Sequence, residues 1–206
     1  METKILQEKD IDSCASLLLK GEVVAFPTET VYGVGVIATK EEAFNALVAS
    51  KRRPPSKPFS MMLSSLKDVD MYAKIGPKGR AVMEKYMPGE ITILVKAKEG
   101  LPHWITLGTP LIGIRIPDSK FVLSLIDKVG APLLVTSANH SGEPTSTSFD
   151  VTYATFKGEI AGVVKGKCVS EKASTIVNIS SEENITLVRE GPIPFEDIKA
   201  TWENAK

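Results

Sequence analysis

The chain has 206 residues, 43% of them hydrophobic, and its 25 lysines and arginines balance 25 aspartates and glutamates. This length and apolar content suit one hydrophobic core of ordinary size, so we expect a single domain over residues 1–206. The zero net charge excludes a global field that would attract nucleic acid or an anionic membrane, so any anion site must be local.

No segment predicts secretion or membrane insertion. Residues 1–10 carry charges where a signal peptide has its apolar core, and no apolar run is long enough to cross a bilayer. We therefore expect a cytoplasmic protein without membrane contacts. Cys14 and Cys168 stand far apart, with only His103 and His140 as further candidate metal ligands. We expect reduced thiols and no metal site of the protein's own.

Hydrophobic periodicity and turn residues divide the first half of the chain into alternating helices and strands. A proline in the first turn and a glycine after the last turn mark helix ends in several places. The elements expected are a helix from Asp10 or Asp12 to Gly21, a strand over 22–26, a polar loop over 26–35, a helix over 40–50, a strand over 59–63, a helix over 64–73, a helix over 77–86 and a strand over 90–96.

The second half continues the alternation without any internal repeat. The elements expected are a strand over 111–116, a helix from Asp118 or Ser119 to Gly130, a strand over 132–136, a loop over 141–148, strands over 161–165, 175–179 and 185–189, and a helix from about residue 196. Because helices and strands interleave irregularly, the predicted fold is of the α/β class, a twisted mixed sheet with flanking helices.

The densest polar stretch runs from Phe26 to Lys57. A buried strand delivers hydroxyls, a carboxylate and a phenol to a loop, and loops carried by rigid strands commonly bind small ligands. In the basic cluster that follows, Lys51, Arg53 and Lys57 are close enough to converge on a triphosphate, whereas Arg52 would point to another helical face. The alternative is an ordinary helix C-terminus whose cations complement the helix dipole.

Small polar residues follow a second buried strand. Residues 132–136 lead directly into Ser137-Ala138-Asn139, and the loop over 141–148 has the Ser, Thr, Gly and Pro content of a lid. Ser137 and Asn139 either hydrogen-bond a ligand or form a turn that ends the strand.

Arg115 ends the strand predicted over 111–116. Its guanidinium can bind a carboxylate through two parallel hydrogen bonds, and the alternative is a salt bridge to Asp118 or another acid. No Walker lysine loop occurs, and the Gly-Val-Gly of the opening loop lacks the third glycine and the downstream acid of a dinucleotide fingerprint. A nucleotide must therefore be held by other means.

Five motifs in this order resemble the YrdC-like family of threonylcarbamoyl-AMP synthases. Together they span nearly the whole chain, and five in the expected order are far more specific than any one. The chain resembles the short form of the family, so no additional C-terminal domain is expected. The motifs are Pro27-Thr28-Glu29-Thr30-Val31-Tyr32-Gly33, Lys51-Arg52-Arg53-Pro54, Ser137-Ala138-Asn139-His140-Ser141-Gly142, Ser174-Thr175-Ile176-Val177 and Leu187-Val188-Arg189-Glu190-Gly191.

The resemblance implies that ATP, bicarbonate and L-threonine give L-threonylcarbamoyl-AMP and diphosphate, the first step of N6-threonylcarbamoyladenosine formation in tRNA. Mg²⁺ would accompany ATP. The other partners implied are downstream tRNA threonylcarbamoyl transferase proteins and, weakly, tRNA. By the same resemblance Lys51 and Arg53 are the catalytic phosphate contacts. The implied ATP-binding residues are Lys51, Arg53, Lys57, Ser137, Asn139, Ser141, Thr145 and Arg189, and the implied threonine-binding residues are Thr30, Arg115 and Ser174.

Two residues depart from the usual family pattern. Lys57 stands where asparagine is common and would add positive charge near the phosphates. Met62 stands where histidine is common and removes a polar contact that would touch threonine. Substrate affinity and identity therefore depend on these positions.

Two other functions fit parts of the sequence. The basic cluster suggests an RNA-binding module without synthase activity, but the zero net charge and the lack of interleaved aromatics oppose it. A carbamoyl-phosphate-using relative of the kind embedded in hydrogenase maturation proteins would need zinc-finger and acylphosphatase parts. This chain has too few residues and cysteines for them.

Overall fold

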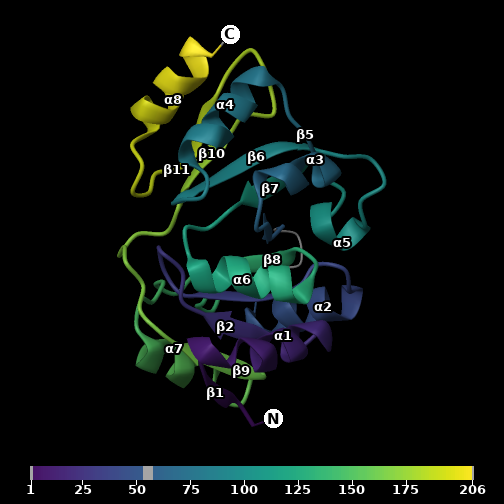
Figure 1. The fold of residues 1–206 in the computed structure, drawn as a ribbon, viewed down its shortest axis with the longest axis vertical. Helices are drawn as coiled ribbons and strands as arrows, with labels where there is room; N and C mark the ends of the chain where they lie inside the picture. Colours follow the sequence, from purple (N-terminus) through teal and green to yellow (C-terminus); the bar gives the residue numbers. More distant parts are fainter. Residues whose placement is uncertain (1, 53–57, 206) are drawn as a thin grey trace.

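We describe the protein from a computed structural model covering residues 2–52 and 58–205. Across these residues one mixed sheet with flanking helices confirms the predicted α/β fold (Figure 1). The strands are β1 (Lys4–Gln7), β2 (Val24–Phe26), β3 (Gly33–Ile37), β4 (Ser60–Met62), β5 (Ala73–Lys74), β6 (Ile91–Ala97), β7 (Leu111–Arg115), β8 (Leu133–Ser137), β9 (Gly162–Lys165), β10 (Thr175–Asn178) and β11 (Thr186–Arg189). The helices are η1 (Glu8–Asp10), α1 (Ile11–Leu19), α2 (Glu41–Ser50), η2 (Leu66–Asp68), α3 (Val69–Tyr72), α4 (Pro77–Tyr86), α5 (His103–Thr106), α6 (Lys120–Val129), α7 (Phe149–Phe156) and α8 (Phe195–Asn204).

The sheet has the strand order β1-β9-β2-β3-β8-β4-β7-β6-β10-β11, and the short β5 pairs with β6 off this path. Strand β9 runs parallel to both of its neighbours, whereas β8 runs antiparallel to both of its own. Helices α1 and α6 pack against each other beside β2, β8 and β9, and α4 and α8 pack together beside β10 and β11 (Figure 1). The core therefore lies between these helices and the sheet.

Helix α6 illustrates how local sequence sets an element. The hydroxyl of Ser119 accepts a hydrogen bond from the Val122 amide, which caps the helix start. Gly130 adopts a left-handed φ of 69° and ends the helix. Apolar residues recur every three or four positions along the helix, so they form one stripe that faces the core. That stripe consists of Val122, Leu125, Ile126 and Val129, all buried.

The polar loop expected over residues 26–35 is partly wrong, because Gly33 begins strand β3. This strand pairs antiparallel with β2 and β8, and every one of its residues is buried. A Cβ atom at Gly35 would lie 2.8 Å from the carbonyl oxygen of Leu134 and 2.9 Å from a methyl of Val135. The glycine therefore serves a close approach of β3 to β8, and not a turn.

Helix α7 and strand β1 were not predicted. The expected loop over 141–148 contains no helix or strand, and α7 begins directly after it, capped by Ser148. Only Thr152 and Phe156 of α7 are buried, so the helix lacks the repeating apolar stripe that identifies such elements in a sequence. No helix in residues 2–52 and 58–205 is both long and apolar enough to span a bilayer.

We expect Gly35→Ala to lower the free energy of unfolding by about 1–3 kcal/mol, because the added methyl overpacks the β3–β8 contact. Urea denaturation monitored by circular dichroism measures the change. Thr186→Ala on the exposed strand β11 is the control and should stay within about 0.5 kcal/mol of the wild type. Equal midpoints for the Gly35 variant and the wild type would contradict the close-approach explanation.

Candidate active site

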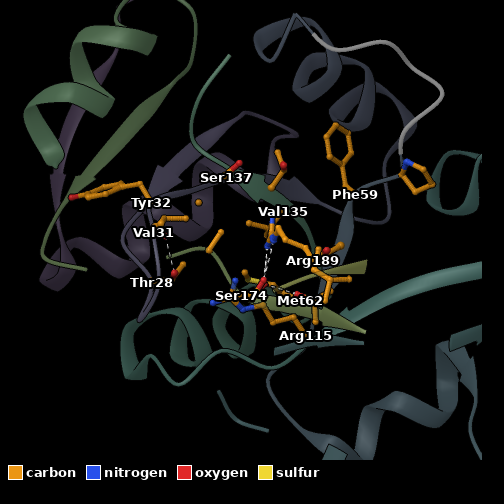
Figure 2. Close-up of a pocket in the computed structure, with 17 residues that line it drawn as sticks. Thr28, Val31, Tyr32, Phe59, Met62, Arg115, Val135, Ser137, Ser174 and Arg189 are labelled. Atoms are coloured by element: carbon orange, nitrogen blue, oxygen red, sulfur yellow. Dashed lines mark hydrogen bonds between the residues drawn. The ribbon is translucent and has the colours of Figure 1, made fainter. Parts of the chain in front are cut away.

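A cavity of about 240 Å³ lies against the sheet, among the residues that the structure describes. Its walls include β3, β8, β4, β7, β6, β10 and β11, which are consecutive in the sheet order. In a flat sheet the first and last of these would stand about 29 Å apart. The sheet must therefore curl around the cavity, as a strongly twisted sheet can. The lining residues are Thr28, Val31, Tyr32, Gly33, Pro58, Phe59, Ser60, Met62, Thr92, Arg115, Val135, Thr136, Ser137, Ala173, Ser174, Ile176 and Arg189 (Figure 2).

Thr28 and Thr30 of the first motif form a chain of hydrogen bonds at one wall of the cavity. Thr28 Oγ1 donates to the Val31 carbonyl at 2.8 Å and lies 2.9 Å from Thr30 Oγ1. Arg115 Nη2 in turn donates to Thr30 Oγ1 at 2.8 Å. Because each hydroxyl has one hydrogen, the chain of donors runs from Arg115 through Thr30 and Thr28 to Val31. The hydrogen bonds of the Thr28–Val31 segment thus fix the orientation of the Arg115 guanidinium.

Tyr32 anchors a second segment to this motif. Its hydroxyl lies 3.1 Å from the Val164 carbonyl and 3.0 Å from the Gly166 carbonyl, and it accepts a hydrogen bond from the Gly166 amide. Burial raises the pKa of Tyr32 to about 12, so the hydroxyl stays neutral near pH 7. Tyr32 therefore holds the start of the loop that leads to Ser174, and its ring points away from the cavity (Figure 2).

Arg115 forms a buried ion pair with Glu29. Arg115 Nη2 donates to Glu29 Oε1 at 2.8 Å, and the two side chains are only 8% and 7% exposed. Of the two alternatives considered for Arg115, a pair with a nearby acid is therefore present, and the acid is Glu29 and not Asp118. Within the described residues neither Glu29 Oε2 nor Arg115 Nε has a hydrogen-bond partner. The pair thus keeps unused hydrogen-bonding capacity beside the cavity.

A second arginine lies close to Arg115. Arg189 Nε and Nη2 donate to the Ser174 carbonyl at 3.1 and 2.7 Å, and Nη2 lies 3.2 Å from Ser174 Oγ, which is 2.9 Å from Thr92 Oγ1. Burial and, secondarily, the positive charge of Arg115 lower the pKa of Arg189. Figure 2 shows both arginines beside Ser174 in the cavity. Two arginines and one glutamate leave one positive charge in excess, which suits a bound monoanion.

Lys51 joins the end of α2 to the segment after β8. It is 2% exposed, and its Nζ donates to the carbonyls of Ser137, at 2.5 Å, and Asn139, and to Asn139 Oδ1 at 3.2 Å. Ser137 Oγ donates to the same Asn139 oxygen at 2.6 Å, and the Lys51 carbonyl accepts from the Ser141 amide. Lys51 therefore orders the Ser137–Ser141 segment, a contact different from the phosphate clamp expected.

The structure brings most of the predicted site residues to one place. Ser137, Arg115, Ser174 and Arg189 line the cavity, Thr30 supports Arg115, and Lys51 and Asn139 adjoin Ser137. Ser141 and Thr145 are exposed on the loop after β8 and do not line the cavity. Arg53 and Lys57 lie outside the described residues. The ligand contacts assigned to all these residues stay predictions.

Several cavity residues were not identified from the sequence. Thr92 alternates with apolar neighbours along β6, a pattern that predicts a solvent-facing hydroxyl, yet it is only 2% exposed. Its side chain faces the cavity, where Thr92 Oγ1 lies 2.9 Å from Ser174 Oγ, and its neighbours Ile91 and Ile93 are buried on the opposite face of β6. Its register partner on β10 is Ile176, which also lines the cavity. Only this pairing brings Thr92 beside Ser174.

Comparisons with known proteins agree with this architecture. The family Sua5/YciO/YrdC, described as telomere recombination, matches residues 16–191. A threonylcarbamoyl-AMP synthase of Bacillus subtilis is 32% identical over 94% of this chain and 56% of its own length. A putative threonylcarbamoyl-AMP synthase of Methanocaldococcus jannaschii is 32% identical over 93% of this chain and 90% of its own.

A crystal structure of Pyrococcus abyssi Sua5 complexed with L-threonine has a TM-score of 0.92 with this chain. Its sequence is 28% identical, and the match covers all of this chain and 62% of that protein. The chain thus spans little more than half the length of the Bacillus subtilis relative and under two thirds of the Pyrococcus abyssi protein. By the extent of these matches, the chain belongs to the Sua5/YciO/YrdC family.

Proposed function

We propose that the chain makes L-threonylcarbamoyl-AMP from L-threonine, bicarbonate and ATP, with release of diphosphate. The observation that carries the proposal is the pair of arginines, Arg115 and Arg189, in one cavity with buried hydroxyls. The names of the Bacillus subtilis and Methanocaldococcus jannaschii relatives support it, as does the L-threonine complex of the Pyrococcus abyssi protein. The product would pass to transferase proteins that modify tRNA.

L-Threonine fits the chemistry of the cavity. Its carboxylate would bind Arg115, whose orientation Glu29 and Thr30 fix in advance. The hydroxyls of Ser174 and Thr92, 2.9 Å apart, offer partners for a substrate hydroxyl, and the side chains of Met62, Val135 and Ile176 offer an apolar wall for its methyl. A single methyl limits the preference over serine to roughly 10 to 200 fold.

The nucleotide would lie at the mouth formed by Ser137, beside Asn139. Lys51 holds the carbonyl groups of both residues, so it would contribute by ordering them as well as by its charge. Arg53 and Lys57 would supply further cations of the triphosphate contact, in keeping with their place shortly after Lys51 in the chain. Arg189 would lie between the two substrates.

The reaction needs alignment and charge neutralisation more than a protein nucleophile. The threonine amine and bicarbonate form a carbamate with loss of water, a carbamate oxygen attacks the α-phosphorus, and the bond to diphosphate breaks. Arg115 and Arg189 would hold the anionic acceptor in place while cations near Ser137 neutralise the leaving diphosphate. No covalent enzyme intermediate is required.

Magnesium would arrive with ATP. The described residues contain no group of three histidine, cysteine, aspartate or glutamate side chains that could hold a metal ion. Glu29, the acid of the first motif, is already paired with Arg115. Phosphate oxygens and water molecules are the usual magnesium ligands in such sites, so the ion would be part of the nucleotide substrate.

We expect diphosphate release from ATP only when L-threonine and bicarbonate are both present, because the attacking carbamate needs both. A coupled diphosphate assay, with each component omitted in turn, measures this dependence. Replacing threonine by valine controls for the hydroxyl contact and should abolish most of the signal. Release that is independent of threonine would exclude the proposed substrate.

We expect Arg115→Lys to raise the dissociation constant of L-threonine by about 10 to 100 fold, because lysine keeps the charge beside Glu29 but loses the forked hydrogen bonds. Isothermal calorimetry measures the constant. Arg80→Lys, at an exposed pair with Asp70, is the matched control and should bind threonine normally. Wild-type threonine affinity in the Arg115 variant would remove this residue from the carboxylate site.

A further inference from the structure

Arg52, Glu159 and His140 form a cluster outside the cavity that links three separate segments. Arg52 Nη2 lies 2.8 Å from Glu159 Oε1, and His140 Nε2 lies 3.0 Å from Glu159 Oε2. Arg52 follows the end of α2, His140 belongs to the segment after β8, and Glu159 lies between α7 and β9. One carboxylate thus bridges both segments that Lys51 also joins.

Several features indicate an ordered contact. Hydrogen bonds from His140 and Arg52 lower the pKa of Glu159, so the carboxylate is ionised near pH 7. An ionised carboxylate only accepts hydrogen bonds, so His140 Nε2 carries the hydrogen. His140 is 9% exposed, the centroid of its ring lies 5.3 Å from that of Phe156, and its Nδ1 lies 3.6 Å from Glu143 Oε2.

The backbone at Arg52 has an unusual conformation. Its φ is 49°, and within residues 2–52 and 58–205 only one other non-glycine residue, Leu107, has a positive φ. A left-handed conformation of this kind is uncommon for an arginine and persists where surrounding contacts determine it. The Glu159 carboxylate is such a contact, and it holds the chain at the point where it leaves α2 towards Arg53.

The cluster lies next to the nucleotide half of the site. Lys51 precedes Arg52, and its Nζ contacts the carbonyls of Ser137 and Asn139. His140 follows Asn139, whose side-chain amide donates to the His140 carbonyl at 2.9 Å. A shift of Arg52 or His140 would therefore move Lys51 or Asn139 directly. The Arg52–Glu159 pair is largely exposed and adds little to the free energy of unfolding, so its loss should act locally, on the positions of Lys51 and Asn139.

We propose that Arg52, Glu159 and His140 are positioning residues that lock the end of α2 to the Ser137–Ser141 segment and so set the affinity for the nucleotide. This inference rests on the proposed function, because it assigns the nucleotide to that side of the cavity. None of the three residues lines the cavity, and none is assigned a contact with substrate.

Glu159→Gln and Arg52→Ala test the proposal. Each should raise the dissociation constant of a non-hydrolysable ATP analogue about two- to fivefold, as expected for loss of an exposed ion pair, while threonine affinity and the thermal midpoint stay at wild-type values. The double variant should lose little more than either single variant, because both break the same link. Arg52→Lys, which keeps the charge, should restore part of the affinity.

Lys128→Ala is the matched control, since Lys128 forms an exposed pair with Asp12 at 2.6 Å between α6 and α1. It should leave nucleotide affinity unchanged. Unchanged nucleotide affinity in both test variants would overturn this inference and leave the proposed function standing. An equal loss of threonine affinity would overturn it too, because it would indicate a general loosening of the fold. A wild-type protein that does not bind the analogue would instead overturn the proposed function, and the inference with it.

Discussion

The buried pair of Glu29 and Arg115 is the contact on which the rest of the site depends. It joins the motif after β2 to the end of β7, which lies four strands further along the sheet. The Glu29 carbonyl also accepts the Ser170 amide, so the same residue holds the loop that leads to Ser174. Removing one partner of such a buried pair typically costs about 3–5 kcal/mol. A variant that breaks this pair would therefore change the cavity and also lower the free energy of unfolding.

The charge balance of the cavity follows from this pair. Glu29 offsets one of the two guanidiniums, and Arg189 adds a second that is partly desolvated. Arg115 is buried and Arg189 belongs to the exposed strand β11, and both line the cavity, so the excess positive charge borders it. An anionic group such as a carboxylate or a phosphate would be stabilised there.

The basic residues at the end of α2 make different kinds of contact. Lys51 points inward and is bound by carbonyls, and Arg52 turns outward to Glu159. The motif resembles a row of equivalent cations, but the helix ends at Ser50 and the left-handed turn at Arg52 separates their directions. Neighbouring cations in a sequence can thus have different functions once the backbone leaves a regular helix.

The sequence by itself determined what depends on near neighbours. Apolar spacing and a closing glycine predict α1, although Asp10 does not cap it, a first-turn proline predicts α4, and a capping serine predicts α6; the five motifs identify the family resemblance. Only the tertiary structure decided the strand at Gly33, the burial of Lys51, the inward side of Thr92 and the pairing of Arg52 with a residue 107 positions away. These features depend on strand register and on the curl of the sheet, which are set by contacts between distant segments that no local pattern encodes.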